Sequence, residues 1–333
     1  MHSAHFRFAD GKALTLPVAP GQTVLEAAME IDAPLRYDCA SGSCGACVAH
    51  LHSGETEFDA DGPSPLSQAE AAAGLRPTCM TRLRGDVVFD LPYALEPAPS
   101  PPAKHTARVA DVDRVAANVH RLVLTLDDGD SFQFQSGQYV RIRPPGARSA
   151  RAYSIASAPD GSGDLEFLIR HVSGGMMSTW LAGSAKPGDR VALQGPLGAF
   201  AHDPRARRHV FLAGGTGLAP AVSILRQLDA ASGPALLCFG CAAPEDLFYE
   251  AELATLMAQN PNLEVRVAVM GGEPGDRARL GTALSLLAPD DVSADAAFYL
   301  CGPPPMVQAS QAWLADHGVH PGAIRCERYI PGG

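Results

Sequence analysis

Four cysteines lie at a spacing that predicts an iron–sulfur centre. Three of them fall within nine residues and the fourth follows in the stretch PTCMTR; they are Cys39, Cys44, Cys47 and Cys79. These intervals are the ones at which four thiolates hold two irons in a [2Fe–2S] cluster. Gly42 and Gly45 are expected to adopt a positive φ, which brings backbone N–H groups close to the sulfurs. Zinc, which usually takes two C-x2-C pairs, and buried thiols are the alternatives.

Two further stretches indicate a flavin site. In RAYSIASAP, Arg151, Tyr153 and Ser154 place a cation, an aromatic ring and a hydroxyl on one expected strand, which suits a phosphate, a flavin ring face and a ring nitrogen. About twenty residues later comes SGGMMSTW, where Gly174 and Gly175 precede a helix expected to start at Ser178. Free N–H groups at a helix N-terminus bind phosphate. The first stretch alone is also typical of a plain surface strand, but the pair favours a flavin.

Two loops near the carboxyl end indicate a dinucleotide site. The stretch GGTGLAP, residues 214–220, directly follows an expected strand and precedes an expected helix, where a phosphate-cradling turn belongs. The stretch CGPPPM begins at Cys301 after a later strand, and CERYI contains Glu327 and Tyr329. We therefore expect nucleotide binding in this part of the chain.

The choice of nicotinamide follows from an absence of cations in the sequence. No lysine or arginine occurs between Arg226 and Arg266, and the loop CAAPEDL carries Glu245 and Asp246. The 2′-phosphate of NADP needs a cation beside the adenosine ribose, whereas a carboxylate accepts hydrogen bonds from a free ribose hydroxyl. NADH is therefore the expected electron donor.

A second C-x2-C pair, Cys238 and Cys241, could be combined with Cys301 and Cys326 into a zinc site. Cys238 lies inside an apolar stretch, and a buried cysteine behaves as a small hydrophobic residue more often than as a ligand. We therefore expect no metal at this pair.

Three groups of elements are needed to position these residues. Residues 5–18 are typical of a β-hairpin around an Ala-Asp-Gly turn, and Thr23 with Glu26 forms a capping box at a helix start. From residue 106, short strands separated by turns predict an antiparallel barrel. From residue 209, strands alternate with helical stretches, among them EDLFYEAELATLM at residues 245–257, which predicts a parallel sheet covered by helices. Between the first two groups, EPAPSPPAKH is rich in proline and is expected to be an extended linker.

The composition excludes several classes of protein. A length of 333 residues suggests two or three domains, and 46% hydrophobic with 19% charged residues is typical of a soluble globular protein. No apolar run approaches the ~18 to 20 residues of a membrane span, and the first residues lack a signal-peptide pattern. The net charge of −10 argues against a nucleic-acid partner; residues 1–93 carry 12 acidic against 6 basic side chains, which suits docking to a basic protein surface or simple solubility. We expect a cytoplasmic monomer that binds neither nucleic acid nor membrane.

Essentially the whole chain resembles a known family. Residues 1–93 resemble plant-type ferredoxins, and the stretches RAYSIASAP, SGGMMSTW, GGTGLAP and CGPPPM resemble the ferredoxin–NADP reductase superfamily. The combination is similar to the electron-transfer reductase components of bacterial aromatic-ring-hydroxylating oxygenases, especially those of benzoate, toluate and anthranilate dioxygenases. RAYSIASAP is equally similar to phenol hydroxylase reductases. Two departures from the family pattern are Ser136, where a proline often precedes GQY, and the four residues that follow Tyr329.

The resemblance implies a multidomain fold of α+β and α/β parts. It implies an N-terminal β-grasp [2Fe–2S] ferredoxin domain, an antiparallel β-barrel that binds FAD and a C-terminal parallel α/β domain that binds NAD. The expected boundaries are 1–95 for the ferredoxin domain, 96–105 for the linker, 106–205 for the FAD domain and 206–333 for the NAD domain.

The resemblance also implies roles for single residues. Arg151 would meet the flavin phosphate, Tyr153 would pack on the isoalloxazine and Ser154 would lie near N5. Cys301 would approach the nicotinamide, and Tyr329 would cover the flavin until the nicotinamide displaces it. The implied FAD contacts are Arg151, Ala152, Tyr153, Ser154, Ile169, Arg170, Gly174, Gly175, Met176, Met177, Ser178 and Tyr329. The implied NAD contacts are Gly214, Gly215, Thr216, Gly217, Asp246, Cys301, Gly302 and Pro303, and the implied catalytic residues are Ser154, Cys301 and Glu327.

The implied activity is electron transfer from NADH through FAD and a [2Fe–2S] cluster to the terminal oxygenase of a ring-hydroxylating dioxygenase system. A flavin suits this path because it takes two electrons as a hydride and releases them singly, as a Rieske or di-iron oxygenase needs. The alternatives are the reductase of a soluble di-iron monooxygenase of the phenol hydroxylase type and another NAD(P)H-dependent iron–sulfur flavoprotein reductase. A redox-sensing interaction protein without turnover is the alternative from a different class.

Overall fold

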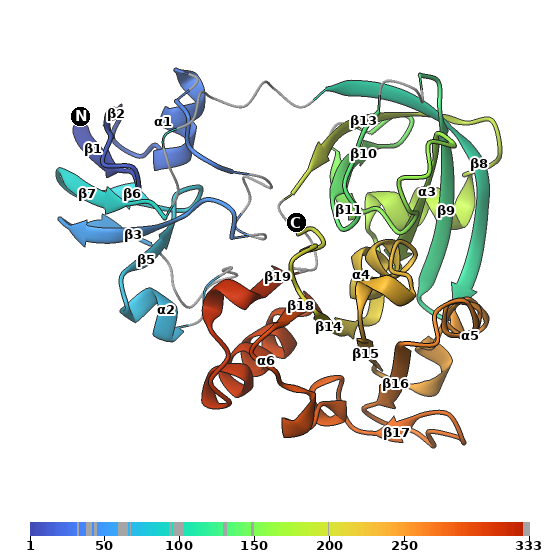
Figure 1. Cartoon of the computed structure of the whole chain (residues 1–333). Coiled ribbons are helices and arrows are strands. Elements are labelled where there is room, and N and C mark those ends of the chain that lie inside the picture. Colours follow the sequence, from blue (N-terminus) through green and yellow to red (C-terminus); the bar gives the residue numbers. More distant parts are fainter. Residues whose placement is uncertain are drawn as a thin grey trace. The chain divides into compact units, whose positions relative to one another are not determined.

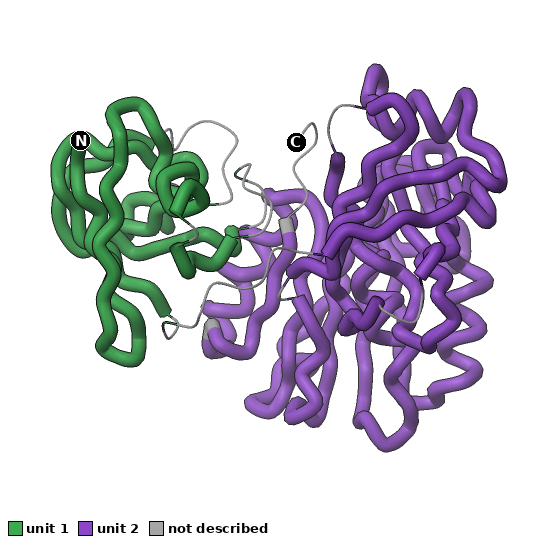
Figure 2. The backbone as a smooth tube through the Cα atoms, turned by 90° about the horizontal axis from the view of Figure 1, so that it is seen from above, with its two compact units in different colours: residues 1–102, 333 green, residues 103–332 purple. Residues whose placement is uncertain are grey.

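The computed structural model describes residues 1–31, 33–37, 42, 45–58, 66, 68–92, 95, 103–128, 132–147, 150–198 and 200–328. The chain forms two compact units, residues 1–102 and residues 103–332 (Figure 2). In the described ranges, no helix is both long enough and apolar enough to cross a membrane.

The first unit is built on a five-stranded sheet (Figure 1). In sheet order its strands are β2 (Ala13–Val18), β1 (His2–Arg7), β7 (Val87–Asp90), β3 (Val48–Ser53) and β5 (Leu75–Pro77). Its described part also contains the paired strands β4 (Thr56–Glu57) and β6 (Arg82–Leu83) and the helices α1 (Val24–Glu30) and α2 (Gln68–Ala72). The predicted hairpin is confirmed, because β1 pairs antiparallel with β2.

Helix α1 begins as the capping box predicts. The Thr23 hydroxyl accepts the Glu26 backbone N–H at 3.2 Å, and the Glu26 carboxylate accepts the Thr23 backbone N–H at 2.8 Å. These bonds satisfy two N–H groups that have no partner within the helix. The apolar face of α1 then packs with Phe6 and Phe89 in the core of the unit.

The first half of the second unit is a closed antiparallel sheet. In sheet order its six described strands are β11 (Arg151–Ser154), β10 (Tyr139–Arg143), β13 (Arg190–Leu197), β8 (Lys104–Ala116), β9 (Val119–Leu126) and β12 (Asp164–Arg170). A bridge between Ile155 and Phe167, with a 2.8 Å hydrogen bond from the Ala156 N–H to the Glu166 carbonyl, joins the two ends of the sheet. The predicted barrel is therefore confirmed, and α3 (Met176–Gly183) packs against its core.

The second half is a parallel sheet with helices on both faces. In sheet order its described strands are β17 (Arg279–Leu280), β16 (Leu263–Val269), β15 (Ala235–Cys241), β14 (Arg208–Gly214), β18 (Ala296–Gly302) and β19 (Ile324–Arg328). Helices α4 (Leu218–Leu225) and α5 (Glu250–Gln259) share a core with one face, and α6 (Pro304–Asp316) shares a core with the other (Figure 1). Short 3₁₀ turns include η2 (Gly215–Gly217) and η4 (Pro244–Asp246).

Three element boundaries and one additional strand differ from the sequence-based expectations. Helix α3 begins at Met176 and not at Ser178, because Gly174, with φ +71°, already turns the chain into it. Strand β8 begins at Lys104, inside the predicted linker, whose residues 96–102 lie outside the described ranges. Helix α5 begins only at Glu250, because Tyr249 has a left-handed backbone. Strand β19 was not predicted, and it extends the sheet by pairing parallel with β18.

Candidate functional site

Two of the four predicted cluster ligands, Cys47 and Cys79, are described, and a threonine joins the loops that carry them. The Cys47 carbonyl accepts both the backbone N–H and the hydroxyl of Thr78, at 3.1 and 3.0 Å, and Cys79 follows directly. Gly42 and Gly45 each have φ +78°, as predicted, and a Cβ on Gly42 would lie 2.3 Å from the Met80 sulfur. Cys39 and Cys44 lie outside the described residues. The described part of the loop therefore fits a cluster-binding backbone.

The three predicted catalytic residues come together at a single carboxylate oxygen. The Ser154 hydroxyl donates to Glu327 Oε2 at 2.9 Å, and the Cys301 thiol donates to the same oxygen at 3.8 Å. All three side chains are buried, with 5%, 9% and 1% exposure for Ser154, Glu327 and Cys301. A carboxylate held between a hydroxyl and a thiol can orient both groups and exchange protons with them.

Strand pairing explains why residues so far apart in sequence meet. Cys301 and Glu327 are direct partners in the β18–β19 pairing, so their side chains lie side by side. Ser154 reaches them from the last position of β11 in the barrel. Strand β19 is anchored by Arg325, which donates to the Asp203 carboxylate at 2.7 Å. Hydrogen bonds from Arg205 and the charge of Arg325 hold the pKa of Asp203 well below its usual range, so this anchor is ionised.

The predicted flavin residues lie on β11, β12 and α3. On β11, Arg151 and Tyr153 are half-buried and Ala152 is exposed, and burial raises the pKa of the Tyr153 phenol, which therefore stays protonated. On β12, Arg170 is exposed, whereas the Ile169 side chain belongs to the barrel core at 1% exposure and can face a ligand only through its backbone.

The start of α3 suits a phosphate group. Gly175 is the N-cap, and no side chain of the described residues caps the helix, so the N–H groups of Met176 and Met177 remain available to a ligand. A Cβ on Gly174 would meet nothing within 4 Å. The Ser178 hydroxyl accepts the Val172 N–H at 2.8 Å, so this side chain stabilises the approach to the helix.

The predicted nucleotide turns lie at the carboxyl edge of the parallel sheet, where such sheets bind ligands. Gly214 ends β14, and η2 with Gly215, Thr216 and Gly217 leads directly into α4, with no side-chain cap in its described surroundings. A Cβ on Gly217 would lie 2.1 Å from the Cys301 carbonyl oxygen. Glycine is therefore required for the two loops to approach, and Gly302 and Pro303 continue from that contact into α6.

The loop expected to meet the ribose follows β15. Asp246 is half-buried in η4, its carbonyl accepts the Cys241 thiol at 3.3 Å, and the exposed Glu245 precedes it. The arginines that flank this segment in sequence are engaged elsewhere. Arg226 binds Glu166, and Arg266 binds Glu264 and Asp291, at 2.6 and 3.1 Å from its Nε and Nη2.

The second C-x2-C pair does not form a metal site. Cys238 packs in the core on the α6 side of the sheet and Cys241 in the core on the α4 side, so their thiols point to opposite faces. Burial raises the pKa of each thiol to about 12. The described residues contain no group of three or more potential ligands placed to hold a metal ion.

Tyr329 lies outside the described residues. Ser136, which departs from the family pattern, is 2% exposed, and its hydroxyl has no hydrogen-bond partner among the described residues.

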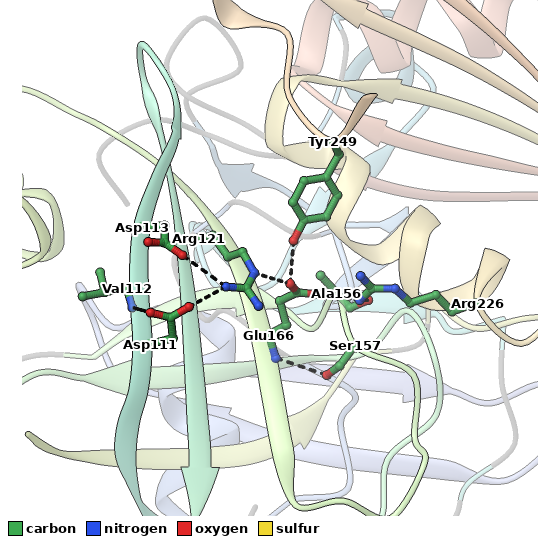
Figure 3. A network of polar contacts seen from close by, with 9 residues as sticks. All are labelled: Asp111, Val112, Asp113, Arg121, Ala156, Ser157, Glu166, Arg226 and Tyr249. Atoms are coloured by element: carbon green, nitrogen blue, oxygen red, sulfur yellow. Dashed lines mark hydrogen bonds and ion pairs between the residues drawn. The ribbon is translucent and has the colours of Figure 1, made fainter. Parts of the chain in front are cut away.

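Sequence reasoning missed a polar network between the barrel and the nucleotide-binding half (Figure 3). Its centre is Glu166 on β12, which contacts Arg121 of β9, Arg226 after α4 and Tyr249 before α5. The available signal was a single carboxylate inside the apolar stretch LEFLI, because a buried charge needs partners.

Comparison with known proteins gives three family matches in the same order. Residues 7–84 match the 2Fe-2S iron-sulfur cluster binding domain, residues 106–202 the oxidoreductase FAD-binding domain and residues 211–312 the oxidoreductase NAD-binding domain. The predicted cofactors, a [2Fe–2S] cluster, FAD and a nicotinamide nucleotide, are thus confirmed as those of the three domains.

Full-length relatives share this arrangement. The chain is 32% identical over 332 residues to the toluate 1,2-dioxygenase electron transfer component of Pseudomonas putida, covering 98% of each chain. It is 39% identical over 268 residues to the methane monooxygenase component C of Methylosinus trichosporium, covering 78% of each. A cytochrome P450 reductase from Amycolatopsis has a similar structure, with a TM-score of 0.72 and 29% identity over 100% of both chains. The chain is therefore an oxidoreductase and belongs to the family of NAD(P)H-dependent iron–sulfur flavoprotein reductases that serve oxygenase systems, which includes the electron-transfer components of aromatic dioxygenases.

Proposed function

We propose that this chain carries electrons from NADH through FAD and the [2Fe–2S] cluster to the terminal oxygenase of an aromatic-ring-hydroxylating dioxygenase system. The observation that carries the proposal is the buried contact of Ser154 and Cys301 with Glu327 at the carboxyl edge of the nucleotide sheet. The likeness to the toluate dioxygenase component over 98% of both chains supports the choice of partner.

The residues of the chain would position the reactants of this transfer. When bound, FAD supplies the conversion of a two-electron hydride donor into single electrons. Arg151 and the N-terminus of α3 would hold its phosphates, and η2 with Cys301 would hold the nucleotide. Glu327 would keep the Ser154 hydroxyl and the Cys301 thiol oriented at the place where hydride passes, and burial of all three would exclude water there.

NADH is the proposed donor because the loop expected to meet the ribose carries Glu245 and Asp246, and the arginines that flank this loop in sequence are bound elsewhere. Arg226 and Arg266, the nearest arginines along the chain, are both held by carboxylates. We expect kcat/KM for reduction of an artificial acceptor to be at least about 100-fold higher with NADH than with NADPH, because Glu245 and Asp246 would repel a phosphate dianion. Equal use of NADPH would overturn this assignment.

The cluster ligands can be tested by metal analysis. We expect two irons and two acid-labile sulfides per chain, as for a [2Fe–2S] centre. Cys44→Ser or Cys47→Ser should lose them. Cys326→Ser, which removes a thiol outside the cluster motif, serves as the control and should keep them. Zinc in place of iron would contradict the proposal.

The partner can be tested by direct electron delivery. NADH-driven reduction of a purified Rieske dioxygenase and of a purified di-iron hydroxylase should be compared at equal concentration. Faster reduction of the Rieske protein is expected, and no reduction of it would overturn the proposed partner.

We further propose that the protein works in the cytoplasm, because NADH and reduced thiols are available there. We propose that it is a monomer there, without nucleic-acid or membrane partners.

A second candidate is the reductase of a soluble di-iron monooxygenase. The observation that favours it is the 39% identity to the methane monooxygenase component over 268 residues. Preferential reduction of the di-iron hydroxylase in the same experiment would support this candidate over the first.

A further inference from the structure

The Glu166 network contains the most unusual backbone conformation of the described chain. Tyr249 has φ +64° and ψ +20°, and among the described residues no other non-glycine residue has a positive φ. Its side chain is 4% exposed, and it is the N-cap residue of α5 without a side-chain cap. Such a conformation costs free energy for a residue with a Cβ and persists only where the surroundings impose it. The contacts of Tyr249 therefore identify the part of the structure that imposes this conformation.

The Tyr249 side chain is held by a hydrogen bond to the barrel. Its hydroxyl donates to Glu166 Oε1 at 2.7 Å, and its ring contacts Phe248 edge-on with centroids 5.8 Å apart. Arg121 Nε donates to the same carboxylate oxygen at 2.6 Å, and Arg226 donates to the other oxygen (Figure 3). Arg121 is balanced in turn by Asp111 and Asp113, at 2.9 and 3.3 Å. Both oxygens of the Glu166 carboxylate are thus occupied.

The ionisation of the network follows from these contacts. Burial alone would raise the pKa of Glu166, but the charge of Arg226 and the hydrogen bonds from Arg226, Tyr249 and Arg121 outweigh it and lower the pKa. Burial and the neighbouring carboxylate raise the pKa of the Tyr249 phenol. Glu166 is therefore a carboxylate that accepts, and Tyr249 is a neutral phenol that donates.

The network connects the flavin side of the site to the nucleotide side. Backbone groups of Glu166 bond to Ala156 and Ser157, which lie two and three residues after Ser154, the last residue of β11. Arg226, at the end of α4, also donates to the Ala156 carbonyl at 2.9 Å. In α4 itself, the Ser223 hydroxyl donates to the Ser157 carbonyl at 2.7 Å. Helix α4, whose start carries the η2 turn, is thereby fixed to the end of β11.

The same network holds the loop that is expected to meet the ribose. Tyr249 ends the segment that begins with η4 and contains Asp246. A second bond runs from the Ala117 N–H, in the turn between β8 and β9, to the Glu245 carbonyl at 3.2 Å. Two contacts with the barrel thus position this loop.

We propose that Glu166 is a positioning residue for hydride transfer, and that its hydrogen bond with Tyr249 also positions the loop that carries Asp246. The Glu166 carboxylate binds Arg226 at the end of α4 and Tyr249 after the loop with Asp246. The Glu166 backbone and Arg226 also bind Ala156, close to Ser154, so one residue links the three segments. Hydride transfer needs close alignment of donor and acceptor, and a displacement of about 1 Å can cost on the order of 100-fold in rate. This inference rests on the site residues of the proposed function, but not on the identity of the oxygenase.

The test uses the full-length, FAD-loaded protein and two conservative variants. Glu166→Gln keeps the shape of the side chain and removes its charge, and Tyr249→Phe removes only the hydroxyl. Anaerobic stopped flow with NADH gives the limiting rate of flavin reduction and the apparent nucleotide Kd. Calorimetric titration with NAD⁺ gives a second Kd that does not depend on turnover, and the visible spectrum gives the FAD content.

Asp291→Asn is the matched control. Asp291 is a buried carboxylate, 5% exposed, that also binds two arginines, Arg208 and Arg266. It precedes β18 and therefore lies at the amino-terminal edge of the sheet, opposite the proposed site. Removing its charge should lower the melting temperature, as Glu166→Gln should, without touching any segment of the proposed site.

The expected results separate positioning from simple stabilisation. Glu166→Gln should slow the limiting rate of flavin reduction by about tenfold or more with FAD retained, and Tyr249→Phe should raise both nucleotide Kd values about fivefold with the limiting rate within about twofold. Asp291→Asn should leave the limiting rate and both nucleotide Kd values within about twofold of those of the parent protein. If Glu166→Gln behaves like Asp291→Asn, the proposal is wrong. If Glu166→Gln fails to fold, Tyr249→Phe decides, and unchanged Kd values overturn the proposal.

A failure of the proposed function gives a different result. Electron delivery from the dithionite-reduced protein to an oxygenase bypasses NADH, so it should be unchanged in Glu166→Gln. If the reduced parent protein delivers no electrons to the oxygenase, the proposed partner is wrong, and the positioning inference is not affected.

Discussion

Two buried glutamates lie where the barrel meets the nucleotide sheet, and their surroundings differ. Glu166 is bound by two arginines and a phenol, whereas the contacts described for Glu327 are a hydroxyl at 2.9 Å and a thiol at 3.8 Å. A carboxylate between cations stays ionised and acts as a fixed link. A carboxylate that accepts from a hydroxyl and a thiol orients both groups. The same side chain is therefore a fixed link in one place and, in the proposed function, an orienting group beside the reacting atoms in the other.

The largest expected effect concerns stability at Glu166. Glu166→Ala should lower the free energy of unfolding of the second unit by about 3 kcal/mol, at the low end for breaking a buried ion pair, because Arg121 and Arg226 are 29% and 26% exposed and regain some hydration. Denaturant unfolding followed by tryptophan fluorescence measures this, since Trp180 and Trp313 both lie in the second unit. A loss below about 1 kcal/mol would mean that the network does not hold the barrel and the nucleotide-binding half together.

Next in size is the effect of Ser154 on hydride transfer. Ser154→Ala should slow flavin reduction by NADH about 100-fold, as for loss of one positioned polar group at a reacting centre. The same fluorescence measurement should show a change in stability of less than about 1 kcal/mol, because one hydrogen bond between side chains is lost. A large loss of stability with an unchanged rate would place Ser154 with Glu166 as a structural residue.

A smaller effect is expected at Cys301. Its thiol lies 3.8 Å from Glu327, a weaker contact than that of Ser154, so Cys301→Ala should slow flavin reduction about tenfold. The spectrum of bound FAD should remain unchanged, since the side chain is 1% exposed and replaced by a smaller one. Unchanged stopped-flow kinetics would remove Cys301 from the mechanism.

The smallest expected effect is on the pH dependence of stability. The pKa of Glu166 in the folded protein is below its ordinary value of 4.5, so its ionised form stabilises the fold above that pH and this contribution is lost as the pH falls through the lowered pKa. The stability difference between the parent protein and Glu166→Gln should be constant from about pH 8 to 5.5 and shrink below about pH 5. A difference that grows with acid would contradict the assigned ionisation.

The sequence predicted elements and motifs whose determinants are local. The Thr23–Glu26 capping box, the positive φ of Gly42 and Gly45 and the strand–glycine turn–helix at residues 214–220 depend on neighbouring residues, and each is confirmed. The start of α3 and the late start of α5 were mispredicted because single residues, Gly174 and Tyr249, have backbone angles that helical periodicity does not reveal.

By itself, the sequence determined which residue types are available for electron transfer and the order of the three domains, because cysteine spacing and glycine turns are written along the chain. Only the tertiary structure decided which of them meet. The pairing of Cys301 with Glu327 depends on β19 joining β18, and the arrival of Ser154 depends on the barrel packing against the sheet. The link from Glu166 to Tyr249 spans 83 positions and forms because a carboxylate inside an apolar strand must find donors once water is removed.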